Sequence, residues 1–214
     1  MDYYVQITPH ILEGFKTSLF VYSLTLLSAM PIGLLIALVV VQVPILKRPV
    51  SVFTWIIRGT PLLLQLYITM YGIPLLFPMR MNRLFAGTIT FIVNYTAYYV
   101  EIFRSGLQII PLGQWQAGYV LGFNTYQKLR YIIFPQVIRN TLLPLINEAI
   151  TLVKDTSLLA AIAIAEMLRN AREIVARDLR VDALIVVGVV YLMFSLFVVL
   201  IGKALEGKLL KVRS

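Results

Sequence analysis

The sequence predicts an all-α integral membrane protein with five transmembrane helices, and three observations support this prediction. First, 59% of the 214 residues are hydrophobic and only 14% are charged, whereas soluble domains average roughly 45–50% and 25%. Second, several apolar runs are long enough to cross a hydrocarbon core of about 30 Å. Third, one polar-rich passage, residues 113–135, lies between such runs, as a water-facing insert would. The length fits a single domain, residues 1–214.

The expected spans follow the apolar runs. A segment with Glu13 and Lys16 precedes the first span and is expected to lie along the membrane interface. Pro31 is expected to kink the first span because proline removes a backbone donor, and Pro44 ends it. The five expected spans are residues 17–43, 52–77, 84–103, 141–164 and 183–205.

The second expected span carries polar residues on one face. Gln65 and Thr69 are four residues apart, so they share a helical face and are candidate substrate contacts. Arg58 and Pro61, earlier in the span, permit two interpretations. One is a kinked packing helix whose arginine extends to the headgroups, and the other is a helix end that lines a pathway.

The third expected span has a polar stripe. Asn94, Tyr98 and Glu101 recur at i, i+4 and i+7, and such a stripe in a membrane helix faces the bundle interior or a cavity. Glu101 and Arg104 are three residues apart and are expected to form an ion pair near the membrane surface. Asn94 and Tyr98 lie deeper and are therefore candidate substrate contacts, with hydrogen bonding between helices as the alternative.

The fourth expected span carries two carboxylates on one face. Glu148, Thr151 and Asp155 follow helical spacing, whereas Lys154 points about 100° away around the helix. Two like charges at one place raise each other's pKa unless a cation joins them. The two carboxylates therefore either form an internal ion-pair network with Lys154 or an arginine, or meet a positively charged group of a substrate.

The charge-dense residues 166–182 predict a solvated helix before the fifth span. Glu166, Arg169, Glu173 and Arg177 follow one another at helical spacing with alternating sign. Three ion pairs along the helix surface are expected from this pattern.

Several function classes are excluded by residues that the chain does not contain. With no cysteine and a single histidine, His10, the sequence offers no thiolate metal site, no cysteine nucleophile, and no histidine-based zinc site or catalytic triad. It contains no phosphate-binding G-x-x-x-x-G-K-[ST] motif, so ATP and Mg²⁺ would be bound by another chain and no cofactor is expected in this one. The net charge of +9 is explained by basic loops flanking a lipid bilayer rather than by nucleic acid.

The polar insert predicts a helix–turn–helix on the water-facing side. Residues 114–121 form the first expected helix, Gly122 its C-terminal stop, and residues 125–131 the second helix. A membrane protein with such a structured insert offers a soluble partner a place to dock.

At these residues the chain resembles the permease subunits of ABC importers. Gln116-Ala117-Gly118, Gly122 and Phe134-Pro135 have the spacing of the EAA loop of that family, with Gln116 where Glu is usual and Gly118 where Ala is usual. Three further runs resemble the polar amino acid branch of the family: Arg58-Gly59-Thr60-Pro61-Leu62-Leu63-Leu64-Gln65, Tyr98 with Glu101-Ile102-Phe103-Arg104-Ser105-Gly106, and Lys154-Asp155-Thr156-Ser157-Leu158.

The resemblance implies a type I importer permease fold and a multi-subunit assembly. Its expected partners are a pair of ATP-binding cassette subunits, a second permease subunit, an extracytoplasmic solute-binding protein and an amino acid substrate. Beyond the resemblance, we expect the second permease subunit to be another copy of this chain, with a different chain as the alternative, and the substrate to be a basic amino acid. The chain itself would be non-catalytic, in a prokaryotic cell membrane, and would work by alternating access. Coupling to the ATPase is expected through the insert, at Gln116, Ala117, Gly118, Gly122, Asn124, Tyr126 and Lys128.

Basic residues predict the orientation in the membrane. Five spans put the termini on opposite sides, and the Lys and Arg bias favours the insert and the C-terminus in the cytoplasm and the N-terminus outside. The basic residues then expected inside are Lys47, Arg48, Arg104, Lys128, Arg130, Arg139, Lys203, Lys208, Lys211 and Arg213; those expected outside are Arg80, Arg83, Arg169, Arg172, Arg177 and Arg180.

Two other function classes stay open. An ion-coupled secondary amino acid transporter would use Glu148 and Asp155 as proton or sodium carriers, although five spans are few for that class and no inverted repeat is visible. A membrane scaffold or assembly factor would have no need for polar stripes in the third and fourth spans.

Overall fold

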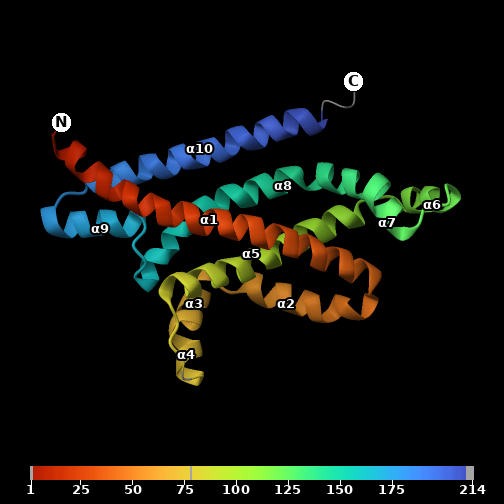
Figure 1. The fold of residues 1–214 in the computed structure, drawn as a ribbon, viewed down its shortest axis with the longest axis horizontal. Helices are drawn as coiled ribbons and strands as arrows, with labels where there is room; N and C mark the ends of the chain where they lie inside the picture. The colour runs from red at the N-terminus through yellow and green to blue at the C-terminus, as the bar shows by residue number, and fades with distance from the viewer. Residues whose placement is uncertain (1, 78, 211–214) are drawn as a thin grey trace.

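Four long helices lie side by side and form the body of the molecule (Figure 1). In this computed structural model, which describes residues 2–77 and 79–210, all regular secondary structure is helical, as the sequence predicts. Shorter helical pieces connect the long ones. The long helices are α1 (Asp2–Gln42), α5 (Arg83–Gln108), α8 (Phe134–Asp155) and α10 (Asp182–Leu210).

The two ends of the bundle differ in what they carry. The N-terminus and α9 (Met167–Asp178) lie at one end, whereas α6 (Leu112–Val120), α7 (Thr125–Gln127) and the last turns of α10 lie at the other (Figure 1). The polar insert and the C-terminal end of α10 therefore lie at the same end of the bundle, and their expected place on the cytoplasmic side stays a prediction. Of the expected basic tail, Lys211 and Arg213 lie outside the described residues.

Length and hydropathy identify fewer spans than the five expected. In the described part of the chain, Tyr3–Gln42 and Asp182–Leu209 are each long and apolar enough to cross a membrane. A bent pair of helices, Pro44–Gly59 and Leu62–Leu76, qualifies as a third span if it is counted as one. Helices α5 and α8 do not qualify, and both carry polar stripes. The number of five spans therefore stays a prediction.

Helix α1 begins earlier than the first expected span. It starts at Asp2, so the segment expected to lie along the interface is continuous with the span, and the helix passes Pro31 without a break. Inside lipid an interrupted helix would leave backbone groups without partners, which favours continuity. Helices α1 and α5 approach closely at Gly33, where a Cβ atom would lie 2.6 Å from Cβ of Tyr99.

The second expected span, residues 52–77, is not one continuous helix, and it agrees with the interpretation in which a helix ends beside Arg58 and Pro61. Helix α2 (Lys47–Gly59), preceded by the short 3-10 turn η1 (Pro44–Leu46), ends before Thr60, whose backbone is extended. The chain turns there by 99°. Pro61 is the physical reason, because proline cannot donate a helical hydrogen bond and disfavours helical backbone in the residue before it. After the turn come α3 (Leu62–Tyr67), the π-helix η2 (Ile68–Gly72) and α4 (Ile73–Leu76).

The insert and the fourth expected span form one helical path. The π-helix η3 (Lys128–Ile133) leads without a loop into α8, which therefore begins before the expected residue 141. Beyond Asp155 the helix tightens into the 3-10 helix η4 (Thr156–Ile162), and Ala163 ends it in the left-handed region at φ 60°. The insert is thus joined to α8 by continuous helix, with no loop between them.

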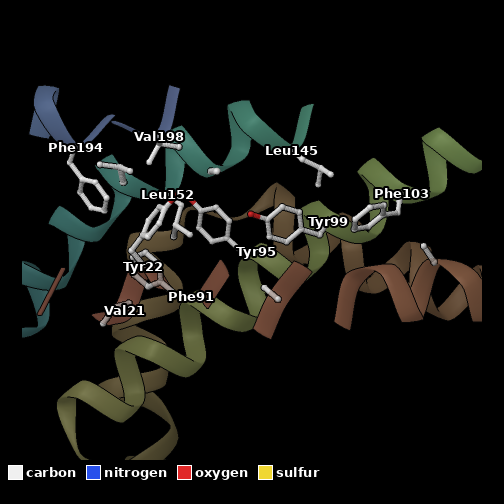
Figure 2. Close-up of a cluster of buried hydrophobic side chains, with 14 of the residues drawn as sticks. Val21, Tyr22, Phe91, Tyr95, Tyr99, Phe103, Leu145, Leu152, Phe194 and Val198 are labelled. Atoms are coloured by element: carbon white, nitrogen blue, oxygen red, sulfur yellow. The ribbon is translucent and has the colours of Figure 1, made fainter. Parts of the chain in front are cut away.

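An aromatic row along α5 fills the centre of the bundle (Figure 2). Its members are four residues apart, so they lie on one stripe of the helix and pack under α8. The row is fully buried in the hydrophobic core. Its residues are Phe91, Tyr95, Tyr99 and Phe103; around them lie Val21 and Tyr22 of α1, Leu145 and Leu152 of α8, and Phe194 and Val198 of α10.

Helix α9 is exposed along its charged face, as predicted, and its other face is buried. One face packs against α1 and α10, with Met167, Ala171 and Ile174 buried. Glu166 is fully buried before the first turn, and its side chain accepts hydrogen bonds from the first backbone N–H groups of the helix. A buried carboxylate serves well there because the N-terminal N–H groups need acceptors.

Only one of the three ion pairs expected on α9 forms in the described chain. Arg169 Nε lies 2.9 Å from Oε1 of Glu173. Glu166 is occupied by the helix N-terminus, and Arg177 pairs with its neighbour Asp178 at 2.6 Å. The hydrogen bond from Arg177 lowers the pKa of Asp178 to about 2.

Candidate substrate pocket and coupling loop

A cavity of about 510 Å³ lies where the bend after α2 meets α5 and α8. This volume is within the range of roughly 300–1,000 Å³ that small-molecule sites occupy. Five of the seven residues predicted to contact substrate line it together, although they come from two different helices. They are Asn94 and Tyr98 of α5 and Glu148, Thr151 and Asp155 of α8.

The two carboxylates of this pocket are sparsely satisfied. Oδ2 of Asp155 accepts a hydrogen bond from the hydroxyl of Tyr95, at 2.8 Å. Glu148 has no hydrogen bond or ion pair with any described residue, and Lys154 is exposed on another face. Within the described chain, the internal ion-pair network that was one alternative for these acids does not form.

One cation faces the same pocket. Arg58, in the last turn of α2, lies with its guanidinium carbon 5.2 Å from the centroid of the Tyr98 ring. Its Nη1 is also 4.0 Å from Oε2 of Glu101. The pocket therefore combines two carboxylates from α8 with one guanidinium from α2.

Glu101 is held outside the pocket by neighbouring side chains. Its Oε1 accepts a hydrogen bond from Thr54 Oγ1, at 2.8 Å, and its Oε2 pairs with Arg104. The ion pair expected between Glu101 and Arg104 is thereby confirmed. Because Thr54 and Arg58 belong to α2, Glu101 fastens α2 to α5 beside the pocket.

Gln65 does not line the pocket but forms hydrogen bonds to residues that do. Its Nε2 donates to the backbone oxygen of Ile57, at 2.7 Å, and to Oγ1 of Thr60, at 2.8 Å. Its Oε1 accepts from Nδ2 of Asn94, at 3.0 Å. These bonds fix the bend and orient an amide that lines the cavity.

Thr69 is not brought to the carboxylates. It lines a separate, mostly apolar cavity beside α3 and η2. The expected shared face of Gln65 and Thr69 does exist, since both line this second cavity, but it points away from Glu148 and Asp155.

Tyr95 is a pocket residue that the sequence analysis did not single out. Its ring is buried in the aromatic row, yet its hydroxyl reaches Asp155. The available signal was its spacing, because Tyr95 precedes Tyr99 by one turn and follows Asn94 directly. Spacing alone does not show which buried tyrosine reaches an acid on another helix.

The insert has the helix–turn–helix shape expected from the sequence. Helix α6 ends before Gly122, whose φ of 68° is in the left-handed region that favours glycine. Asn124 then begins α7 in a capping box with Gln127, in which each side chain bonds the backbone N–H of the other at 2.9 Å. The second arm does not stop near Tyr131 as expected but continues through η3 into α8.

Most residues of the insert that were predicted to couple to an ATPase are exposed. These are Gln116, Ala117, Gly122, Asn124 and Tyr126. Large apolar side chains are exposed between them, and Val120 is the most open at 88%. Exposed apolar side chains on a water-facing loop are typical of a protein interface.

Gly118 and Lys128 are buried inside the insert. Only 5% of Lys128 is exposed, and its Nζ lies 3.2 Å from the centroid of the Tyr119 ring. A Cβ atom on residue 118 would lie 2.5 Å from Cγ of Lys128, so the lysine stem occupies the space that the glycine leaves. In this structure Lys128 joins the two arms of the insert and is not displayed to a partner.

Comparison with known proteins identifies the family. Residues 29–211 match the family described as binding-protein-dependent transport system inner membrane component. The chain belongs to this family. The resemblance predicted from the sequence motifs is thus confirmed, and the family description places its members in the inner membrane.

Members of this family that serve amino acid transport are similar over nearly the whole chain. The L-cystine transport system permease protein TcyB of Bacillus subtilis is 37% identical over 87% of this chain and 82% of its own length. The arginine transport system permease protein ArtQ of the same organism is 30% identical over 94% and 93%. The glutamine transport system permease protein GlnP of Escherichia coli is 33% identical over 94% and 93%.

Solved structures of transporters confirm the importer permease fold. A crystal structure of an amino acid ABC transporter with histidines superposes with a TM-score of 0.86 at 30% identity, covering 95% of this chain and 96% of that one. The inward-facing MetNI methionine ABC transporter superposes at 0.77 with 15% identity, covering 98% and 99%, a likeness of fold.

Proposed function

We propose that this chain is the permease subunit of an ATP-driven importer for polar amino acids, that basic amino acids are its preferred cargo, and that the pocket at Glu148 and Asp155 holds the cargo. The observation that carries the proposal is the pair of carboxylates in one cavity without a cation bonded to either. A charge within a membrane segment is costly unless a partner compensates it. A cationic substrate group supplies that partner.

The charges of the pocket suit a zwitterion with a cationic side chain. Every free amino acid brings an α-carboxylate, for which the Arg58 guanidinium offers a planar, bidentate donor. It also brings an α-ammonium, for which one of the two carboxylates suffices. The remaining carboxylate is then free for the side-chain cation of arginine, lysine or histidine.

Partner subunits take the remaining surfaces in this proposal. The exposed insert, with Val120 and Tyr126 at its tip, docks into an ATPase subunit in the cytoplasm. A second copy of the chain completes the pathway across a two-fold axis, and a solute-binding protein delivers cargo at the opposite end, near α9. The N-terminus is then outside and the C-terminus in the cytoplasm, in agreement with the Lys and Arg bias.

Uptake by the complete transporter in proteoliposomes tests the proposal. ATP inside the vesicles should drive uptake of labelled arginine, and unlabelled lysine and histidine should compete better than glutamine or cystine. Uptake driven by a proton or sodium gradient without ATP would contradict the importer mechanism and favour an ion-coupled transporter.

Two conservative variants test the role of the carboxylates in selectivity. Of Glu148→Gln and Asp155→Asn, the one that removes the partner of the side-chain cation should lower arginine uptake by about tenfold or more and spare glutamine uptake. Lys154→Gln is the matched control, because Lys154 neighbours Asp155 but is exposed. If neither acid variant changes the ratio of arginine to glutamine uptake, the preference for basic cargo is wrong.

A further inference from the structure

We propose that the groove between α1, α5 and η3 binds an anionic phospholipid, with one acyl chain along the groove and the headgroup phosphate on Arg130. The groove encloses about 240 Å³. Its walls are apolar, with Leu34 and Leu38 from α1 and Leu107 from the end of α5. The polar lining side chains are Tyr126 and Arg130, and both belong to the insert.

The groove lies where a lipid can enter it. Leu34, Leu38 and Leu107 are close to the C-terminal ends of their helices, at the end of the bundle that carries the insert (Figure 1). On the same stretch of α1, Leu35 and Val39 are exposed, so the helix presents apolar side chains outward there, as a lipid-facing surface does. An apolar groove that ends at a basic residue of a water-facing loop matches the two parts of a phospholipid, an apolar chain and a charged headgroup.

The charge around the groove selects an anionic headgroup. Arg130 is exposed and has no hydrogen bond or ion pair with any other described residue. From residue 102 to residue 147 the sequence contains no Asp or Glu, whereas it contains Arg104, Lys128, Arg130 and Arg139. No nearby carboxylate of this segment therefore competes for the guanidinium, which binds phosphate in bidentate geometry. A phosphatidylcholine headgroup carries the same phosphate together with a cationic choline. Its net charge is zero, so this basic surface attracts it less than an anionic headgroup.

The site connects the membrane to the coupling loop. Tyr126 lines the groove and is at the same time an exposed residue of the tip that we assign to the ATPase. Ile133 and Val137, also in the lining, lie on the continuous helical path from the insert into α8. The inference stands on the groove and its charge, and it does not depend on what the protein transports.

Photolabelling of the full-length protein in nanodiscs tests the inference. The probe is a phosphatidylglycerol with a diazirine on one acyl chain, compared with the phosphatidylcholine bearing the same chain, and labelled peptides are located by mass spectrometry. We expect labelling of the peptides that contain Leu38 and Val137, stronger with the anionic probe. Arg130→Gln should lower that labelling about fivefold, the factor equivalent to ~1 kcal/mol per basic residue near an anionic membrane surface.

Two further variants separate a built site from general attraction to basic surfaces. Arg139→Gln removes an exposed basic residue on the same side but outside the groove lining and should leave labelling unchanged. Leu34→Trp fills the groove while keeping Arg130 and should abolish labelling there. Melting temperatures of the variants, measured in the same nanodiscs, should match the unmodified protein and exclude misfolding.

Distinct outcomes would overturn the inference. Equal loss of labelling in Arg130→Gln and Arg139→Gln would mean diffuse electrostatic attraction. Equal labelling by both probes would mean that Arg130 does not select the headgroup. Arg130 would then be assigned to contact with a protein partner. Glycerol 3-phosphate in excess should not displace the probe, because it lacks the acyl chain; displacement would show that the groove takes free phosphate esters rather than lipid.

Discussion

Two regions of this molecule place carboxylates among packed helices, and the carboxylates of the two regions differ in how many hydrogen-bond partners they have. Glu166, before α9, is fully buried and accepts hydrogen bonds from the backbone N–H groups of Leu168 and Arg169, at 2.9 and 2.7 Å, and from the Tyr191 hydroxyl, at 2.8 Å. Glu148 and Asp155 share a cavity and receive one hydrogen bond between them in the described chain. Glu166 has a full set of hydrogen-bond donors around it, whereas Glu148 and Asp155 can still accept further hydrogen bonds.

The difference indicates a structural role for Glu166, whereas the two pocket acids keep unused hydrogen-bonding capacity, as the proposed substrate site requires. Glu166 ties α9 to α10 and lies against Gly14 of α1, where a Cβ atom would come within 2.5 Å of the Glu166 backbone. Nothing else can reach it. The pocket acids are kept open to a cavity of substrate size, which a protein tolerates when a ligand supplies the missing partners.

The largest expected effect comes from removing the saturated acid. Glu166→Ala leaves two backbone N–H groups and the Tyr191 hydroxyl without their acceptor, and we expect a loss of ~3–5 kcal/mol in the free energy of unfolding. Thermal unfolding in detergent measures it. Glu173→Ala on the same helix is the control, because Glu173 is exposed and its pairing with Arg169 contributes at most about 1 kcal/mol. Equal melting temperatures for both variants would remove the distinction.

The opposite result is expected at the pocket. Asp155→Asn keeps the shape and the hydrogen bond from Tyr95, so the melting temperature should stay within about 2 °C of the parent, since small stability changes shift it by only a few degrees. ATP-driven uptake should nevertheless fall about tenfold or more, because the substrate loses a charged partner. A variant that melts much earlier with normal specific uptake would assign Asp155 to structure.

A smaller effect on stability is expected at Lys128, the buried cation of the insert. This prediction extends the comparison from buried carboxylates to a buried positive charge. Gly118→Ala places a methyl group against the stem of Lys128 and should cost ~1–3 kcal/mol locally, with more ATP hydrolysed per amino acid imported. Lys128→Ala in addition removes the clash and should restore much of the coupling ratio. If the double variant is no better coupled than Gly118→Ala alone, contact between the arms is not the cause.

The smallest effects are expected at two threonines that sequence spacing treats alike. Thr69 lines the apolar cavity and Thr151 lines the carboxylate pocket. Thr69→Val should leave the KM for arginine uptake within about twofold, whereas Thr151→Val should raise it a few-fold through loss of one neutral polar contact. A larger change at Thr69 than at Thr151 would place the substrate in the other cavity.

Much of the candidate site was predictable because helical spacing is a strong local signal. The shared face of Glu148, Thr151 and Asp155 and the stripe of Asn94 and Tyr98 both line the pocket as expected. Spacing says nothing about which face of one helix meets which face of another. The sequence analysis therefore included Thr69, omitted Tyr95, and treated Lys128 as a displayed residue.

The sequence by itself determined the all-α class, the family, and the positions of local turns and helix ends. Composition, four motifs in order and residues such as Gly122, whose turn needs a left-handed backbone, suffice for these conclusions. Tertiary structure decided between the two arrangements that Pro61 left open, a kinked helix or a helix end, in favour of a turn of 99°. It also decided the burial of Lys128 beside Tyr119. It also decided which acids are saturated, because partners such as Tyr191 for Glu166 lie far along the chain and only packing brings them within hydrogen-bond distance.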